Sequence, residues 1–185
     1  TRVMHNKVTF FVERFIEGYI RSFSSEFLFI KGGGNLQHNI PNFGNLYMWE
    51  IPFLIFGIYF LFKKQMKWRF FLLFWLLVAP LPAAITKDAP HSARMLSFLP
   101  LPHILSAIGF VECISLFKQK TVQKGVTVLG AIFLIANFGL YLDRYFVHFP
   151  KVSEASWGGG YKELISSLSE VSADYSQLIM ARQNY

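Results

Sequence analysis

Four long apolar runs constrain this chain more than any other feature. They cover residues 46–62, 68–85, 96–117 and 126–146. Each is roughly 17 to 22 residues long, the length that a helix needs to cross the hydrocarbon core of a bilayer. Because lipid offers no hydrogen-bond partners, a single segment crosses it only as a helix. Buried helices of a large soluble protein are the alternative, but the basic or aromatic flanks of all four runs favour the membrane. We therefore predict an all-α membrane protein with four transmembrane helices.

The composition agrees with a membrane protein and not with a nucleic-acid-binding one. Of the 185 residues, 53% are hydrophobic and only 16% are charged, whereas soluble domains carry about a quarter charged residues. The net charge of +7 matters through its distribution, so we expect membrane lipids and no nucleic acid as partners. The five histidines have no metal-ligand spacing, and the single Cys113 cannot form an internal disulfide. The chain begins with Thr1, and we interpret it as part of a longer protein.

Basic residues orient the four predicted helices. The link between the first two runs and the link between the last two each hold lysine or arginine and no acid. These basic residues are Lys63, Lys64, Lys67, Arg69, Lys118, Lys120 and Lys124. Short loops rich in lysine and arginine stay in the cytoplasm. Residues 1–45, 86–94 and 147–185 are therefore expected on the outer side of the membrane.

The two flanking segments are expected outside the hydrocarbon core. In residues 8–23 apolar side chains recur at helical spacing, which predicts a helix that lies in the outer interface or, alternatively, packs on a soluble domain. A glycine-rich loop follows it and completes the segment 1–45. In the segment 147–185 the pattern predicts a helix over 161–172 and a strand over 176–181, as at the start of an extracytoplasmic α/β domain.

Prolines interrupt the outer ends of the two middle runs. Pro80 and Pro82 lie near the end of the second run, and Pro100 and Pro102 lie near the start of the third. Proline removes a helix donor, and freed carbonyls at membrane depth need protein or a watery cavity to satisfy them. The prolines therefore indicate a cavity at the outer face, capped by residues 86–94. Simple helix termination is the alternative.

The polar island between the second and third runs holds the candidate binding residues. Lys87, His91 and Arg94 supply hydrogen-bond donors beside the outer headgroups, and Asp88 supplies an acceptor for a hydroxyl or a base. Arginine suits phosphate oxygens because its guanidinium donates two parallel hydrogen bonds, and lysine adds a point charge. An anionic lipid headgroup such as a polyprenyl phosphate fits this set. In the alternative interpretation, Lys87 and Arg94 only anchor helix ends at headgroups.

Two ordered stretches carry a resemblance to a known family. The first is residues 27–41, FLFIKGGGNLQHNIP, and the second is residues 75–94, WLLVAPLPAAITKDAPHSAR. Further matching positions are Gly44, Leu46, Tyr47, Glu50 to Phe53, Trp157, Gly158 and Tyr161 to Glu163. Together they resemble the C-terminal half of bacterial GT-C glycosyltransferases of the family 39 type, relatives of the protein O-mannosyltransferases and of the lipid A aminoarabinose transferases.

The resemblance implies a reaction. A sugar would move from a polyprenyl-phosphate carrier to an acceptor at the outer membrane face, with the carrier phosphate as the leaving group. Such a transfer needs a base for the acceptor's proton and cations for the developing phosphate charge. The family's catalytic acidic residue lies in an outward loop that no part of this chain matches, so no catalytic residue is assigned. The resemblance places Lys87, Asp88, His91 and Arg94 where donor-phosphate recognition is expected.

Some features remain open. Relatives often carry an acidic residue in the glycine run and Pro-Arg before the histidine, which this chain lacks. Asn35, His38 and Glu50 are possible cavity residues. A loop packed on the outer face is the favoured explanation of the first two, and Glu50 could instead lie at the interface. The sequence requires no cofactor, leaves a divalent metal open, and does not identify the acceptor. The alternative function is non-enzymatic: a multispanning transporter or assembly subunit whose outer loop only anchors helices.

Overall fold

The described chain is built from helices alone. The computed structural model describes residues 6–171 and Tyr175, and every regular element in them is a helix. The α-helices are α1 Lys7–Arg21, α2 Glu50–Lys63, α3 Arg69–Val78, α4 Leu81–Ala84, α5 Pro100–Ser115, α6 Lys120–Asp143, α7 Phe149–Ser153 and α8 Tyr161–Val171. Shorter π or 3₁₀ turns are Glu26–Ile30, Ala93–Met95, Arg144–His148 and Glu154–Trp157. The all-α prediction is confirmed for these residues, while the predicted strand over 176–181 lies outside them.

A crossing of two glycines joins α2 to α5. A Cβ atom built on Gly57 would clash with the carbonyl oxygen of Leu105, and one built on Gly109 would clash with that of Phe53. The two backbones therefore approach more closely than any side chain would allow, which is how small residues pack helices in membranes. Beside this crossing a small apolar core gathers Leu61, Leu72, Leu101 and Leu105.

The prolines mark helix ends. α3 ends at Val78, and Pro80 and Pro82 begin the single turn of α4, while Pro100 starts α5. Proline fits the first turn of a helix because the donor that it lacks has no partner there. The second apolar run is therefore broken into α3 and α4 instead of forming one helix over 68–85.

α1 packs on α4 through small residues. Gly18 of α1 lies where a Cβ would come within 2.7 Å of the Ala89 side chain and 3.3 Å of the Ala84 carbonyl oxygen. The Tyr19 hydroxyl donates a hydrogen bond of 2.8 Å to the Leu77 carbonyl. Several apolar side chains of α1 remain exposed, namely Val8, Phe11, Val12, Ile16 and Ile20. An apolar face left open in this way suits a helix that lies in a membrane interface.

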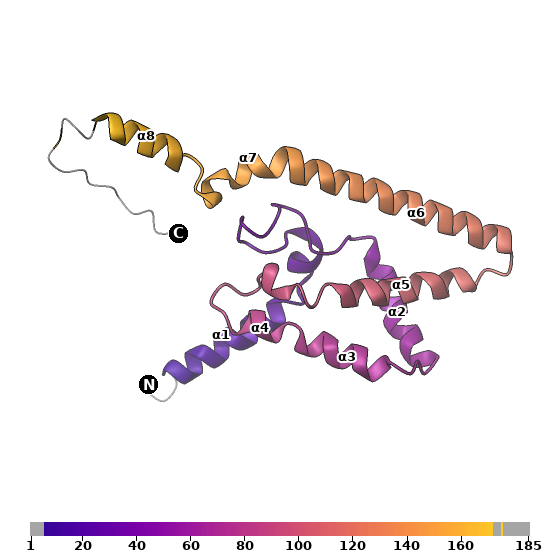
Figure 1. Cartoon of the computed structure of the whole chain (residues 1–185). Coiled ribbons are helices and arrows are strands. Elements are labelled where there is room, and N and C mark those ends of the chain that lie inside the picture. Colours follow the sequence, from indigo (N-terminus) through magenta and orange to yellow (C-terminus); the bar gives the residue numbers. More distant parts are fainter. Residues whose placement is uncertain (1–5, 172–174, 176–185) are drawn as a thin grey trace.

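The two lysine-rich turns lie at one end of the helical assembly. Figure 1 shows the α2–α3 turn and the α5–α6 turn at the same end, with the α4–α5 loop at the opposite end. A salt bridge from Lys64 to Glu112 ties the end of α2 to the last turns of α5. The basic turns and the polar loop thus lie at opposite ends of the helical assembly.

Among the described helices, one is long and apolar enough to cross a bilayer by itself. It starts at Lys120 and continues through α6 and α7 to Trp157, and none of its most apolar stretch is buried. α5 has 16 residues and α2 has 14, so they rise about 24 Å and 21 Å. Large apolar side chains are exposed on α3, such as Phe70 and Phe74, and on α6, such as Leu129. Of the four predicted spans, the fourth is the one that meets this criterion among the described helices.

The glycine crossing generates a stability prediction. Gly57→Ala should lower the free energy of unfolding by about 1–3 kcal/mol, because the added methyl forces α2 away from the α5 backbone. Gly139→Ala is the matched control, since nothing lies within 4 Å of a Cβ at that position of α6, and it should leave stability unchanged or raise it slightly. Thermal unfolding of the protein in micelles measures both, and equal losses would contradict the crossing.

Candidate functional site

The polar loop is held together by its own charges. The Arg94 guanidinium donates hydrogen bonds to the Asp88 carboxylate at 2.7 Å and to the Thr86 hydroxyl at 2.8 Å. The hydrogen bond from Arg94 keeps the pKa of Asp88 below its ordinary value. Both side chains are partly exposed, Arg94 at 40% and Asp88 at 51%. The pair therefore organises the loop while leaving Arg94 within reach of a ligand that competes with Asp88.

His91 is the buried member of the loop. Its side chain is only 5% exposed, and its Nε2 lies 3.6 Å from the Asp88 carboxylate. Its Nδ1 is buried without a hydrogen-bond partner among the described residues. Burial, and then the nearby Arg94 charge, lower the pKa of His91 from its ordinary value. The His38 ring lies beside it, with 5.1 Å between the ring centroids.

The glycine run closes against the loop. The Gly33 amide donates a hydrogen bond of 3.0 Å to the Ser92 hydroxyl, which in turn donates one of 3.1 Å to the Asn39 side chain. A Cβ on Gly33 would come within 2.8 Å of that hydroxyl, so the contact requires glycine at this position. Asn39 also donates to the Lys31 carbonyl at 2.8 Å. Two segments that are separate in the sequence thus form one wall.

These two segments enclose a cavity, here called the loop cavity, of about 660 Å³. Its lining combines cations, carboxylates and imidazoles with backbone of the glycine run. The lining residues are Arg21, Ser24, Glu26, Phe27, Lys31, Gly32, Gly33, Gly34, Asn35, His38, Asp88, Ala89, Pro90, His91 and Ser92. Lys31 forms an ion pair of 2.6 Å with Glu26, so most charges of the cavity are already paired.

The structure brings together some of the residues predicted to bind ligand and separates others. Asn35, His38, Asp88 and His91 all line the loop cavity. Arg94 contacts Asp88 from outside that lining, and Lys87 is exposed beside it. Glu50 lies apart from the loop cavity.

Glu50 pairs with His103, a contact that sequence reasoning missed. Glu50 is 4% exposed, and its Oε2 lies 2.8 Å from His103 Nδ1. The Tyr47 amide donates a hydrogen bond of 3.1 Å to the other carboxylate oxygen. The available signal was that each residue lies in the first turn of a helix that follows a loop. A buried carboxylate with a fixed imidazole partner is a candidate for a functional role.

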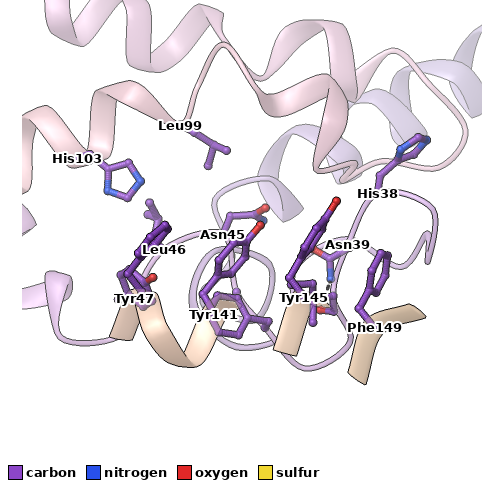
Figure 2. Close-up of a pocket in the computed structure, with 14 residues that line it drawn as sticks. His38, Asn39, Asn45, Leu46, Tyr47, Leu99, His103, Tyr141, Tyr145 and Phe149 are labelled. Carbon is purple, nitrogen blue, oxygen red and sulfur yellow. Dashed lines mark hydrogen bonds between the residues drawn. The ribbon is translucent and has the colours of Figure 1, made fainter. Parts of the chain in front are cut away.

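Two further cavities adjoin this pair. The tyrosine pocket (Figure 2) has a volume of about 370 Å³ and includes His38, Tyr47, His103, Tyr141 and Tyr145. The apolar cavity has a volume of about 660 Å³ and lies between α5 and α6. The tyrosine pocket shares His38 with the loop cavity, and it shares Tyr47, His103 and Phe138 with the apolar cavity. The three cavities therefore follow one another from charged, through uncharged polar, to apolar walls.

Comparisons of this chain with known proteins identify no relative. A scan against protein-family models and searches of curated proteins and of solved structures found no match. Within the part of the chain that the structure describes, no group of three or more histidine, cysteine, aspartate or glutamate side chains is arranged to hold a metal ion. The prediction from the sequence, that no cofactor is required and that a divalent metal is left open, therefore stays a prediction.

The buried His91 generates a pH prediction. Because the folded chain lowers the pKa of His91 below its ordinary 6.5, the unfolded chain binds the proton more readily. The stability that neutral His91 contributes is therefore present above about pH 6.5 and declines as the pH falls towards the lower, folded pKa. His91→Gln should reduce the loss of melting temperature between pH 7.5 and pH 5.5.

The exposed His148 provides the control for this measurement. Its side chain is 66% exposed, so His148→Gln should keep the wild-type difference between the two pH values. Melting curves of all three proteins in the same micelles are compared. A His91→Gln protein that loses as much as the wild type would contradict the buried, neutral imidazole.

Proposed function

We propose that this chain is the C-terminal part of an integral membrane glycosyltransferase of the GT-C, family 39 type. The enzyme would move a sugar from a polyprenyl-phosphate carrier to an acceptor at the outer face of the bacterial plasma membrane. The observation that carries the proposal is an ionisable cavity at the end of an apolar helical assembly opposite its lysine-rich turns. Lysine-rich turns in the cytoplasm would place this cavity at the outer face, where it could meet a charged headgroup.

The membrane topology is part of the proposal. α2, α3 with α4, α5, and α6 would cross the bilayer, and α1 would lie in the outer interface. The exposed apolar side chains of these helices support it, because a soluble protein of this size would bury such a surface. α2 and α5 are shorter than the hydrocarbon core, and local thinning of the bilayer or flanking interfacial residues compensate for such a mismatch.

Donor-phosphate binding is assigned to the polar loop. Arg94 offers a guanidinium that is held by one carboxylate and one hydroxyl, so a phosphate that enters the loop cavity can replace Asp88 as its partner. Lys87 is exposed next to this pair and adds positive charge at the rim. His91 and the glycine run form the wall behind. The phosphate would thus meet cations that stabilise its charge as the sugar leaves.

Transfer by the full-length protein tests the proposal. In proteoliposomes, labelled sugar should pass from a polyprenyl-phosphate donor to lipid or protein acceptors. Arg94→Ala should raise the donor KM about tenfold to a hundredfold, because a hydrogen bond to a charged group is lost. Lys87→Ala should raise it only about twofold to fivefold, since exposed charges contribute little.

The control is Lys124→Ala, which removes a lysine at the opposite end of the assembly and should leave the donor KM unchanged. Unchanged donor affinity in both loop variants would remove the loop assignment. A full-length protein that transfers no sugar from any polyprenyl-phosphate donor would favour the non-enzymatic alternative.

A further inference from the structure

The tyrosine pocket carries hydrogen-bonding groups that the described chain leaves unused. Tyr47, Tyr141 and Tyr145 line it (Figure 2), and their hydroxyls bond no other described residue. Asn45 donates its side-chain amide to the Phe27 carbonyl at 3.0 Å, which leaves its carbonyl oxygen as an acceptor. Hydroxyls that bond no other described residue offer directional contacts to a ligand that enters the pocket.

The α6–α7 side of this pocket is a fixed row of rings. Tyr141 and Tyr145 stack with centroids 6.0 Å apart, and Tyr145 and Phe149 stack with centroids 5.7 Å apart. Tyrosines at a membrane interface often act only as anchors in the headgroup layer. Here the row instead converges on one pocket with residues of the 38–47 segment and of α5 (Figure 2). The stack restrains the rings, so their hydroxyls are placed in advance of binding.

His103 lies on the inner wall of the pocket, while its partner Glu50 lines the neighbouring apolar cavity. Because His103 Nδ1 bonds Glu50 Oε2, Nε2 is the ring atom left for a ligand. The buried carboxylate fixes the orientation of the ring, as a carboxylate bonded to one ring nitrogen does for other functional histidines. The His103 side chain is 48% exposed, so a ligand in the pocket can reach it.

The pocket excludes charge. None of its 14 lining residues is an aspartate, glutamate, lysine or arginine. A phosphate, a carboxylate or an ammonium group would lose its hydration here without gaining an opposite charge. An uncharged group with several hydroxyls would lose much less, because hydroxyls, an amide oxygen and imidazole nitrogens replace its water.

The neighbouring apolar cavity adds a second requirement. Beyond the shared Tyr47, His103 and Phe138, its walls are mainly apolar, including Phe110, Leu134 and Ile135. The Glu50 carboxylate also lines it and is bonded to His103. A cavity of this kind takes a hydrocarbon chain. A molecule that fills both spaces therefore has an uncharged polyhydroxyl head and an apolar tail.

We propose that the tyrosine pocket and the apolar cavity bind the acceptor, a lipid with an uncharged, hydroxyl-bearing head such as a neutral glycolipid. The proposal rests on the glycosyltransferase function, for which it specifies the acceptor class. Through His38 the head lies next to the loop cavity, where the donor phosphate is assigned. His103 is a binding residue that accepts a hydrogen bond from a head hydroxyl.

The transfer balances without a further reagent. The acceptor hydroxyl oxygen forms a bond to the anomeric carbon of the donor sugar, and the bond from that carbon to the phosphate oxygen breaks. Its electron pair leaves with the polyprenyl phosphate. The hydroxyl proton passes to the base of the full-length enzyme, outside this chain.

Lipid binding tests the pocket directly. The full-length protein is placed in nanodiscs that contain hexosyl diacylglycerol, phosphatidylglycerol or diacylglycerol with the same acyl chains, and retained lipid is quantified by native mass spectrometry. Hexosyl diacylglycerol should be retained most. The double variant Tyr141→Phe, Tyr145→Phe keeps the ring stack and should lower that retention about tenfold, because two hydrogen bonds are lost. His103→Gln should lower it about fivefold.

Tyr59→Phe is the matched control. Tyr59 lies on α2 outside all three cavities, with Lys63 over its ring, and the variant should bind as the wild type does. Equal retention of phosphatidylglycerol and hexosyl diacylglycerol, or unchanged retention in the double variant, would overturn the proposal.

A transfer assay distinguishes the acceptor proposal from the glycosyltransferase function on which it rests. Hexosyl diacylglycerol and a serine-rich peptide are offered as acceptors with the same polyprenyl-phosphate donor. Product on the glycolipid that falls in the double variant supports the acceptor site. Product on the peptide alone overturns the acceptor class while the glycosyltransferase function stands, and no product on either overturns both.

Discussion

The glycine crossing between α2 and α5 is the contact on which the rest of the structure depends. Gly57 and Gly109 let the two backbones touch, and this one contact sets what lies at both ends of the pair. At one end it brings Glu50 to His103, and at the other it brings Lys64 to Glu112. In the proposed bilayer, lipid would not drive apolar helices together, so close backbone packing and a few polar contacts would have to hold the assembly. A buried carboxylate such as that of Glu50 needs a bonded partner, and His103 is that partner.

The proline breaks turn the end of this helical pair into a set of cavities. α3 stops before Pro80, α5 starts at Pro100, and the chain between them folds as a polar loop against the glycine run. The walls change from charged, through uncharged polar, to apolar as the cavities pass from the loop to the space between α5 and α6. A reaction between a phosphate-linked sugar and a neutral glycolipid would use all three environments. It would place anionic and neutral groups in separate, adjoining spaces.

The sequence predicted the helical class, because that class follows from hydropathy along the chain. It did not predict at which residues the helices begin. Hydropathy marks residues that suit lipid, and lysines extend a helix as well as apolar residues do, so α6 begins at Lys120 and not at residue 126. α2 begins at Glu50 and not at residue 46, because the Glu50 carboxylate bonds the Tyr47 amide in the turn before it. The contacts Glu50–His103 and Gly33–Ser92 join residues 53 and 59 positions apart, and only tertiary packing decides such pairs.

The sidedness of the loop is the claim on which the proposed chemistry rests, and thiol labelling in intact cells measures it. Cys113 is replaced by serine, and a single cysteine is introduced by Ala93→Cys in the polar loop or by Gln119→Cys in the α5–α6 turn. Both positions are exposed. A membrane-impermeant maleimide should label the first variant in intact cells and the second only after the membrane is permeabilised. Labelling of both from the same side, or of the Gln119→Cys protein alone in intact cells, would contradict an outer-face site.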